Sequence, residues 1–269
     1  MINKMINLKQ YIENSSILEA LIEENKVVSF KDANGRPKKF GQCIILGGGP
    51  GIGKGFIRSN YLDTDYKIFN VDDYKELYNK MVKAGLIDDK EYNLGNNKET
   101  SELHGIIKGK GWKSKDRDKM LNSSHIVSKD RLPNICFDVT AKDIKTFEEI
   151  FEQIDGLGYE ITFVWVVGNL EVAIYNNSKR KRQVPFDILT DTHNLVNKLI
   201  PEILSNKYPG ISEKIDRAFI CLSAGIGRKL ADKWSGSPVI EVPKKDNKFD
   251  YDSVKRDIET FISEKQPEK

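Results

Sequence analysis

Residues 43–55 read CIILGGGPGIGKG, an apolar run that stops at a cluster of glycines and a single lysine. The G-x-x-x-x-G-K spacing, from Gly48 to Lys54, is typical of a phosphate-binding loop between a strand and a helix. Glycines let the backbone turn several N–H groups toward one phosphate, and the helix that follows adds the positive end of its dipole. The stretch therefore predicts a binding site for a nucleoside triphosphate.

The loop supplies both binding and catalytic candidates. Lys54 would bring a mobile cation to the terminal phosphates, so we expect it to act in catalysis. The residues expected to bind the nucleotide are Gly48, Gly49, Pro50, Gly51, Ile52, Gly53, Lys54, Gly55 and Phe56. A glycine-rich turn with a chance lysine is the alternative. The buried-strand pattern before the loop and the helical pattern after it argue against that alternative.

The position after the lysine departs from the common motif. Serine or threonine usually stands there and ligates magnesium through its hydroxyl, whereas this chain has Gly55. Residues 48–55 (GGPGIGKG) resemble the G-x-P-G-x-G-K-G form of adenylate-kinase-like nucleotide kinases position for position. Magnesium would then depend more on water, the nucleotide and carboxylates than on a hydroxyl of the loop.

The composition is that of a folded protein. The 269 residues are enough for one α/β domain with insertions, and 39% hydrophobic with 31% charged residues excludes a disordered chain. The net charge of +3 is too small to indicate nucleic-acid binding. No stretch approaches the roughly 20 apolar residues of a membrane span. Cys43, Cys136 and Cys221 lie in apolar runs, as expected of buried thiols, so we expect a cytoplasmic protein that does not bind membranes.

Apolar runs alternate with helical patterns along the chain. Strands are predicted at 42–46, 67–71, 134–139, 159–167 and 218–222, with a short edge piece at 239–242. Continuous apolar strands between amphipathic helices indicate a parallel sheet with helices on both faces. The predicted fold class is α/β: a phosphate-loop NTPase three-layer sandwich with a mainly parallel five-stranded sheet and a lid segment.

Two acidic residues follow predicted strands, at the edge of a parallel sheet where ligands bind. Asp72 comes after the second strand, where it would either orient and deprotonate an acceptor hydroxyl or cap the next helix. Asp138 comes after the third strand, where it would act on the metal side of the site, commonly through water, or serve as a turn residue.

Residues 179–182 read KRKR, a run of four cations after the fourth strand. In this fold the position commonly carries a lid whose arginines close over phosphates, because the guanidinium fork binds phosphate oxygens in pairs. We therefore expect Arg180 and Arg182 to act on the moving phosphoryl group. A solvated helix face and a nucleic-acid patch are the alternatives.

Taken together, these segments resemble the zeta-toxin-like group of phosphate-loop kinases, which is similar to polynucleotide, gluconate and adenylate kinases. The resemblance spans about residues 40–230 in the right order. It rests on the glycine loop, Asn70-Val71-Asp72, Asp138-Val139-Thr140 and Arg182-Gln183-Val184-Pro185. It implies ATP as donor, Mg²⁺ as cofactor, Asp72 as base, and Arg180 and Arg182 as phosphate clamps.

The resemblance also implies how the chain is organised into a single domain. We expect a single kinase domain over 1–269, with a helical extension at 1–40, an insertion at 86–131 and a lid at 170–186. The insertion is polar and dotted with glycines. It is either a partly helical cover for a substrate or a surface loop, and the pattern does not decide between them.

The function expected from the sequence is an ATP-dependent kinase. It would phosphorylate a hydroxyl or phosphate of a small molecule, nucleotide sugar or nucleotide. A polynucleotide-end kinase is an alternative, suggested by Trp112 among lysines, although nucleic acid is not the favoured partner. An inactive ATP-binding interaction module is another, suggested by Gly55. The resemblance also allows for an inhibitory protein partner.

Overall fold

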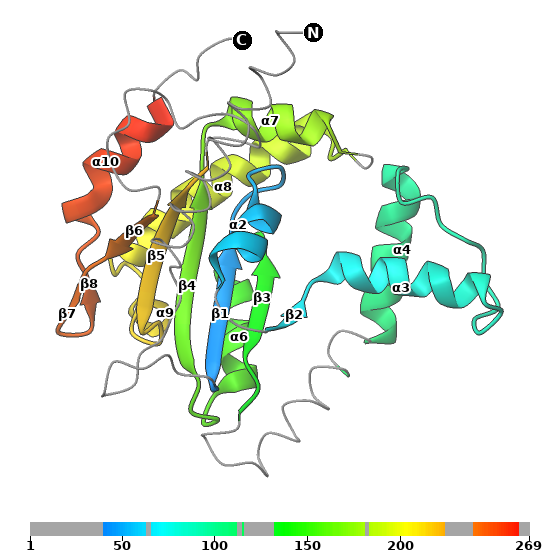
Figure 1. Cartoon of the computed structure of the whole chain (residues 1–269), viewed down its shortest axis with the longest axis horizontal. Helices are drawn as coiled ribbons and strands as arrows, with labels where there is room; N and C mark the ends of the chain where they lie inside the picture. Colours follow the sequence, from blue (N-terminus) through cyan, green and yellow to red (C-terminus); the bar gives the residue numbers. More distant parts are fainter. Residues whose placement is uncertain are drawn as a thin grey trace, which may run out of the picture.

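A six-stranded sheet in the order β2-β3-β1-β4-β5-β6 runs through the molecule (Figure 1). The structure is a computed structural model that describes residues 40–62, 66–111, 115, 132–180, 183–223 and 239–263. The strands are β1 (Gln42–Gly47), β2 (Lys67–Phe69), β3 (Ile135–Val139), β4 (Glu160–Val167), β5 (Arg217–Leu222) and β6 (Val239–Val242). The first five strands pair with one another in the parallel sense, and β6 pairs with β5 in the antiparallel sense.

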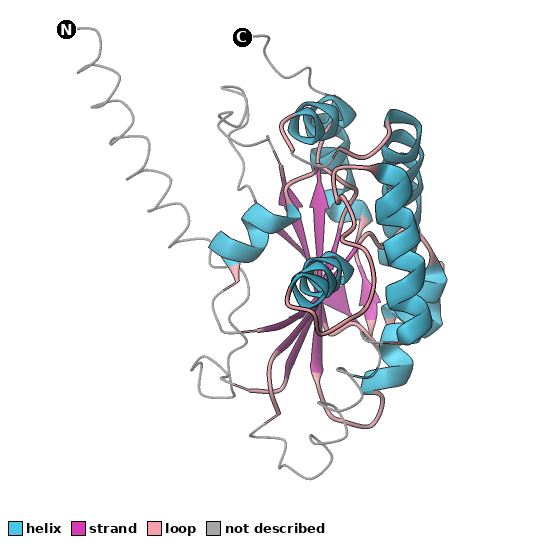
Figure 2. Ribbon diagram, turned by 90° about the vertical axis from the view of Figure 1, so that its right-hand side faces the viewer, coloured by secondary structure: helices cyan, strands magenta, loops and turns pink. Residues whose placement is uncertain are grey.

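Helices connect the strands and cover both faces of the sheet (Figure 2). They are α2 (Lys54–Tyr61), α3 (Val71–Lys83), α4 (Asn97–Lys110), α6 (Ile144–Ile154), α7 (Leu170–Ser178), α8 (Phe186–Leu204), α9 (Pro209–Ser212) and α10 (Asp252–Ser263). A short hairpin of β7 (Lys244–Lys245) and β8 (Lys248–Phe249) precedes α10. The expected α/β fold class is confirmed, and the edge piece at 239–242 joins the sheet as its sixth strand.

Alternation along the central strand divides the core into two layers. Cys43 and Ile45 of β1 point into one hydrophobic cluster, whereas Ile44 and Leu46 point into the other. Successive side chains of a strand face opposite sides, so a strand buried on both sides reads as a continuous apolar run. The larger cluster packs α6, α8 and α10 on the sheet, and the smaller one packs α2 and α7 on the opposite face.

The strand order puts the residues that follow β1 at the functional edge of the sheet. The chain passes from β1 outward to β2, returns to β3 beside β1, and then places β4 on the other side of β1. Such a reversal leaves a crevice at the carboxyl ends of the strands, where α/β proteins bind ligands. The register sets Leu46 opposite Asp138, so the glycine loop begins beside that carboxylate.

Helices α3 and α4 form a lobe at the β2 edge of the sheet (Figure 1). Tyr78, Tyr92, Leu103 and Ile107 make a small core of their own between the two helices. Helix α4 lies within the expected insertion at 86–131, so this part of it is a packed helix rather than a loop. Residues 112–114 and 116–131 of that segment, including Trp112, lie outside the described residues, as do residues 1–39 of the extension expected at 1–40.

The strand expected over residues 67–71 is shorter than predicted. Strand β2 ends at Phe69, and α3 begins at Val71, because the Asn70 side chain caps the helix by accepting the backbone N–H of Asp72. Over the described ranges, the structure contains no helix with both the length and the apolar character needed to cross a membrane.

Replacement of Phe147 should test the larger core. The Phe147 side chain is fully buried, with its ring centroid 5.5 Å from that of Phe163. Phe147→Ala should therefore lower the free energy of unfolding by about 3–5 kcal/mol, measured by urea titration. Phe186, 66% exposed, is the matched control, and Phe186→Ala should change stability by no more than about 0.5 kcal/mol. Equal losses for both variants would contradict this core assignment.

Candidate phosphate-binding site

The glycine loop leaves β1 and turns into α2 at the carboxyl edge of the sheet. Gly51 and Gly53 adopt φ of 77° and 102°, a region that residues with a Cβ rarely enter. Packing restricts Gly51 further, since a Cβ there would stand 2.3 Å from the carbonyl oxygen of Ala173 in α7. The loop therefore needs glycine at this position both for its backbone conformation and for the approach of α7.

Lys54, the first residue of α2, lies back along the loop. Its Nζ donates to the carbonyl of Gly48 at 2.7 Å and lies 4.0 Å from Oδ1 of Asp138. Burial lowers the pKa of Lys54; the charge of Asp138 opposes this, Arg180 adds to it, and Asp72 opposes it more weakly. The pKa of this one ammonium group thus responds to charges from β3, from α3 and from the segment after α7.

Asp138 is the carboxylate at the centre of the described site. Its Oδ2 accepts a hydrogen bond from Nδ2 of Asn70 at 3.1 Å and lies 3.5 Å from the guanidinium of Arg58. Burial raises the pKa of Asp138, and the neighbouring charges of Lys54 and Arg58 and the Asn70 hydrogen bond oppose that rise. The hydrogen bond from Asn70 and the ion pair with Arg58 hold this carboxylate in a fixed orientation beside the loop.

Asp72 lies on the first turn of α3. Asn70 caps the helix, so the alternative that Asp72 is itself the cap is wrong. Its Oδ1 accepts from Nζ of Lys75 at 2.9 Å, and 45% of its side chain is exposed. Lys75 is only 3% exposed, which is rare for lysine unless its charge is paired. Asp72 therefore faces solvent with one oxygen tied to a buried cation.

The residues present fit magnesium only in part. Asp138 offers the oxygen ligands that a hard cation prefers, and its position at the end of β3 beside the loop suits a contact through water. Within the described residues, no three His, Cys, Asp or Glu side chains gather as a metal site. Gly55 itself offers no hydroxyl, and a Cβ at this position would stand in open space. A bound magnesium would thus be held largely by phosphate oxygens and water.

The expected lid over 170–186 comprises α7 and the segment that follows this helix. Arg180 follows this helix closely, with its backbone N–H donating to the carbonyl of Asn177 at 3.1 Å. Arg180 is near enough to Lys54 for its charge to lower the pKa of that lysine. Arg182, expected as the second clamp, lies outside the described residues.

Several residues of the site are not predicted from the sequence. Arg58 could have been predicted, because it stands four residues after Lys54 and therefore lies on the same face of α2. Lys75 is similarly placed three residues after Asp72. Asn176 of α7 and His193 of α8 contact the loop from distant parts of the chain, and no local pattern indicates them.

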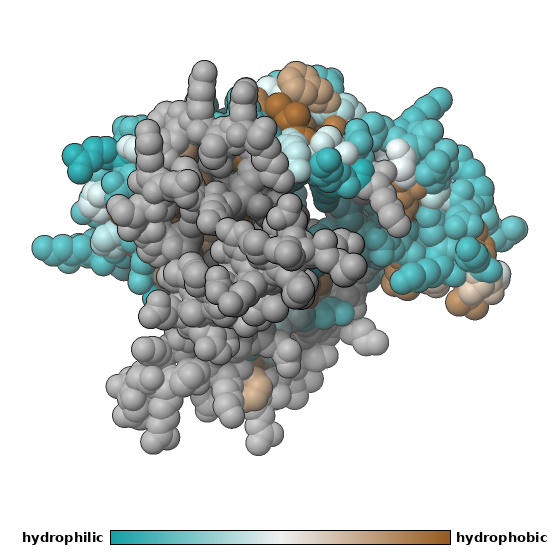
Figure 3. Space-filling view, turned by 45° about the horizontal axis from the view of Figure 1, so that its top comes forward, coloured by the Kyte–Doolittle hydropathy of each residue, from teal (hydrophilic) through white to brown (hydrophobic). Residues whose placement is uncertain are grey.

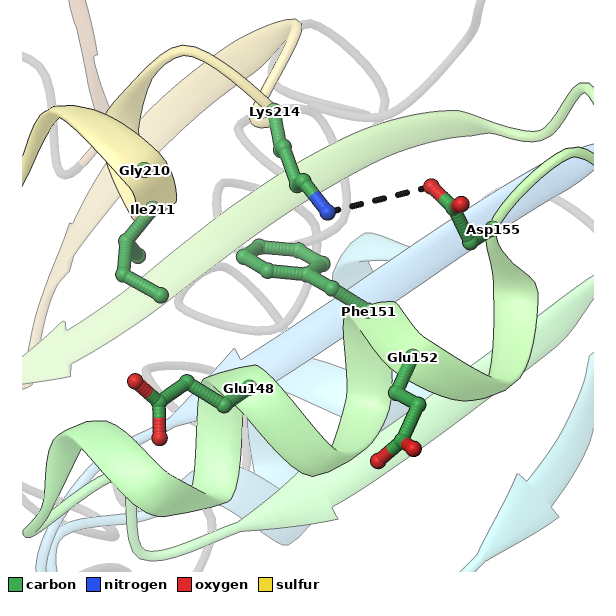
Figure 4. A pocket seen from close by; sticks show the side chains of 7 residues that line it. All are labelled: Glu148, Phe151, Glu152, Asp155, Gly210, Ile211 and Lys214. Atoms are coloured by element: carbon green, nitrogen blue, oxygen red, sulfur yellow. Dashed lines mark ion pairs between the residues drawn. The ribbon is translucent and has the colours of Figure 1, made fainter.

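A separate pocket of about 350 Å³ lies between α6 and α9 (Figure 4). Glu148, Glu152 and Asp155 line it together with Lys214, whose Nζ is 3.7 Å from Oδ1 of Asp155. It lies toward the amino end of β4, because α6 connects β3 to the start of that strand. Its acidic lining and its distance along the sheet from the glycine loop make it unsuited to the phosphates.

Comparison with solved structures finds the same fold. A chain of the AvrRxo1-ORF1:AvrRxo1-ORF2 complex with ATP matches at TM-score 0.50 and 12% identity, over 98% of this chain and 74% of that chain. The complex with sulphate ions matches at TM-score 0.50 and 12% identity, over 97% and 74%. A chain from the PezAT chromosomal toxin–antitoxin system of Streptococcus pneumoniae matches at TM-score 0.46 and 17% identity, over 77% and 76%.

No family model and no curated protein matches the chain. At identities this low the matches establish the fold and not the reaction. They confirm the α/β fold predicted from the strand pattern.

Two glycines of the loop should respond oppositely to alanine. Gly51→Ala forces a left-handed residue against α7, and the backbone conformation alone costs about 1–2 kcal/mol. Gly55→Ala meets open space within α2 and should stabilise the fold by about 0.5–1 kcal/mol. Urea unfolding of both variants checks the pair. Equal stability of Gly51→Ala and wild type would contradict the tight contact between α7 and the loop.

Proposed function

We propose that the chain is an ATP-dependent kinase. It transfers the γ-phosphoryl group of ATP to a hydroxyl or phosphate of a small molecule, nucleotide sugar or nucleotide. The observation that carries the proposal is the cluster of side chains around Asp138 at the carboxyl edge of the sheet. Asp138 lies 4.0 Å from Nζ of Lys54 and 3.5 Å from the guanidinium of Arg58, and it accepts a hydrogen bond from Asn70 at the start of α3. A fold that shares its architecture with a structure holding ATP supports the choice of donor.

The donor phosphates would lie over the loop. Backbone N–H groups of the loop and the start of α2 would bind phosphate oxygens, and Lys54 would leave the Gly48 carbonyl to neutralise the terminal phosphates. Arg180 and Arg182 would stabilise the charge of the phosphoryl group in transfer. Magnesium, when bound, would neutralise the β- and γ-oxygens, with Asp138 holding it through water.

The acceptor would enter beside α3. Figure 3 shows a hollow between the α3–α4 lobe, at the right, and the rest of the molecule. Asp72 lies on the first turn of α3, and 45% of its side chain is exposed, so we expect the acceptor hydroxyl to approach it here. In a loose transition state the hydroxyl needs orientation more than early deprotonation, and a carboxylate tied to Lys75 suits that role.

A protein partner is part of the proposal. The matched AvrRxo1-ORF1 and AvrRxo1-ORF2 form a complex of two proteins, which supports a search for an inhibitory partner of this chain.

The test is phosphate transfer from radiolabelled ATP to a panel of nucleotide sugars, nucleoside monophosphates and oligonucleotides. Lys54→Ala should lower kcat/KM by about 10²–10³ because the phosphates lose their cation. Asp72→Asn should lower kcat by about 10²–10⁴ and leave ATP affinity unchanged. Asp73→Asn, an exposed neighbour on the same turn, is the matched control and should retain full activity.

Wild-type protein that shows no heat of ATP binding by calorimetry would refute the proposal. ATP binding without transfer to any acceptor would favour an inactive binding module instead. Transfer to oligonucleotides alone, lost as salt rises, would favour a polynucleotide-end kinase.

A further inference from the structure

The part of the expected lid that carries the arginines, residues 179–185 (hereafter the lid), lies between α7 and α8. Helix α7 precedes it, and its Ala173 carbonyl fills the space beside Gly51. Helix α8 follows it, and Cα of its His193 would be 3.6 Å from a Cβ on Gly49. The loop thus lies directly against the backbone of α7 at Gly51, whereas α8 leaves room for a methyl group at Gly49. A shift of Gly51 toward α7 must move that helix.

Asn176 forms a direct bond across this contact. Its Nδ2 donates to the carbonyl oxygen of Gly51 at 2.8 Å, and the residue is only 9% exposed. The peptide that joins Gly51 to Ile52 is planar and trans, so its C=O and N–H point in opposite directions. Because Asn176 holds the C=O toward α7, the N–H of Ile52 is held away from α7. A peptide that follows a glycine in the left-handed region would otherwise rotate easily.

The next residue, Asn177, joins the two ends of the lid. Asn177, 8% exposed, donates from Nδ2 to the carbonyl of Val184 at 2.8 Å and accepts the N–H of Val184 at 2.9 Å. The side chain therefore joins the end of α7 to the segment that leads into α8. Adjacent residues of a helix point about 100° apart, so one asparagine faces the loop while its neighbour faces the lid.

Arg180 lies in the sequence between Asn177 and Val184, the two residues that these hydrogen bonds join. Its backbone N–H bonds to the carbonyl of Asn177, and Nε2 of Gln183 donates to the carbonyl of Ser178 at 3.1 Å. The placement of this arginine thus depends on the same two-residue segment that holds the glycine loop.

We propose that Asn176 and Asn177 are positioning residues that couple nucleotide binding in the loop to the placement of the lid. Asn176 keeps the Ile52 amide turned to the phosphates, and Asn177 sets the position of Arg180. Both are neutral, so they order the site without competing for the charge of the nucleotide. The inference rests on the proposed function for the identity of the nucleotide.

Affinity for ATP tests the role of Asn176. Asn176→Ala should raise the calorimetric Kd for ATP by about tenfold, as expected for one hydrogen bond. Asn176→Asp keeps the shape but cannot donate and adds a negative charge, so it should raise Kd further. Asn177→Ala should leave Kd for ATP within about threefold of wild type.

Hydrogen exchange of the full chain tests the coupling. Saturating ATP should slow exchange of the amides in 177–185 of the wild type, and this protection should be lost in Asn176→Ala and in Asn177→Ala. Asn134→Ala is the matched control. Asn134 is 7% exposed and accepts the N–H of Gln42 at 3.1 Å, near the amino ends of β1 and β3. It should lower thermal stability yet leave both Kd and ATP-dependent protection unchanged.

Two results separate the possible failures. A wild type that binds no ATP would overturn the proposed function and this inference with it. A wild type that binds ATP, with Asn176→Ala behaving as Asn134→Ala does in affinity and protection, would overturn the coupling alone.

Discussion

The site depends on one carboxylate held between cations. Asp138 ends β3 directly beside the glycine loop, and it is shared by Lys54 and Arg58 of α2 and by Asn70 at the start of α3. Removing charge from water is costly, and the neighbouring cations offset that cost only if their geometry is kept. The same contacts therefore fix α2 and α3 relative to the central strands. Asn70 also accepts the backbone N–H of Asp72, which fixes the backbone position of that residue.

Close packing is the second constraint on the site. The loop is not a free turn above the sheet, because α7 and α8 approach it at Gly51 and Gly49. Because Gly51 has no Cβ, the backbone of α7 can reach the loop. Asn176 of α7 then donates a hydrogen bond to the carbonyl of Gly51, and this bond makes the contact rigid. In the proposed kinase, this contact would hold the loop amides in the orientation that phosphate binding requires.

Local patterns were enough to predict the elements and their order. The apolar run before the glycines is β1, and strands β3, β4 and β5 occur where continuous apolar residues predicted them. The ends of elements were harder, as at Asn70, where a side-chain cap starts α3 before the apolar pattern of β2 is complete. The alternative that Asp72 caps the helix failed for the same reason, because the choice between two neighbouring polar residues depends on backbone conformation.

By itself, the sequence determined the strand–loop–helix unit, the parallel sheet and the presence of acidic residues at its carboxyl edge. These depend on periodicity and on glycine spacing, which act over a few residues. Only the tertiary structure decided that Asn176 and His193 meet the loop, that Lys75 is buried against Asp72, and that Arg58 shares Asp138. The contact between Asn176 and Gly51, for example, joins residues 125 positions apart. Such geometry comes from strand order and helix packing rather than from any local pattern.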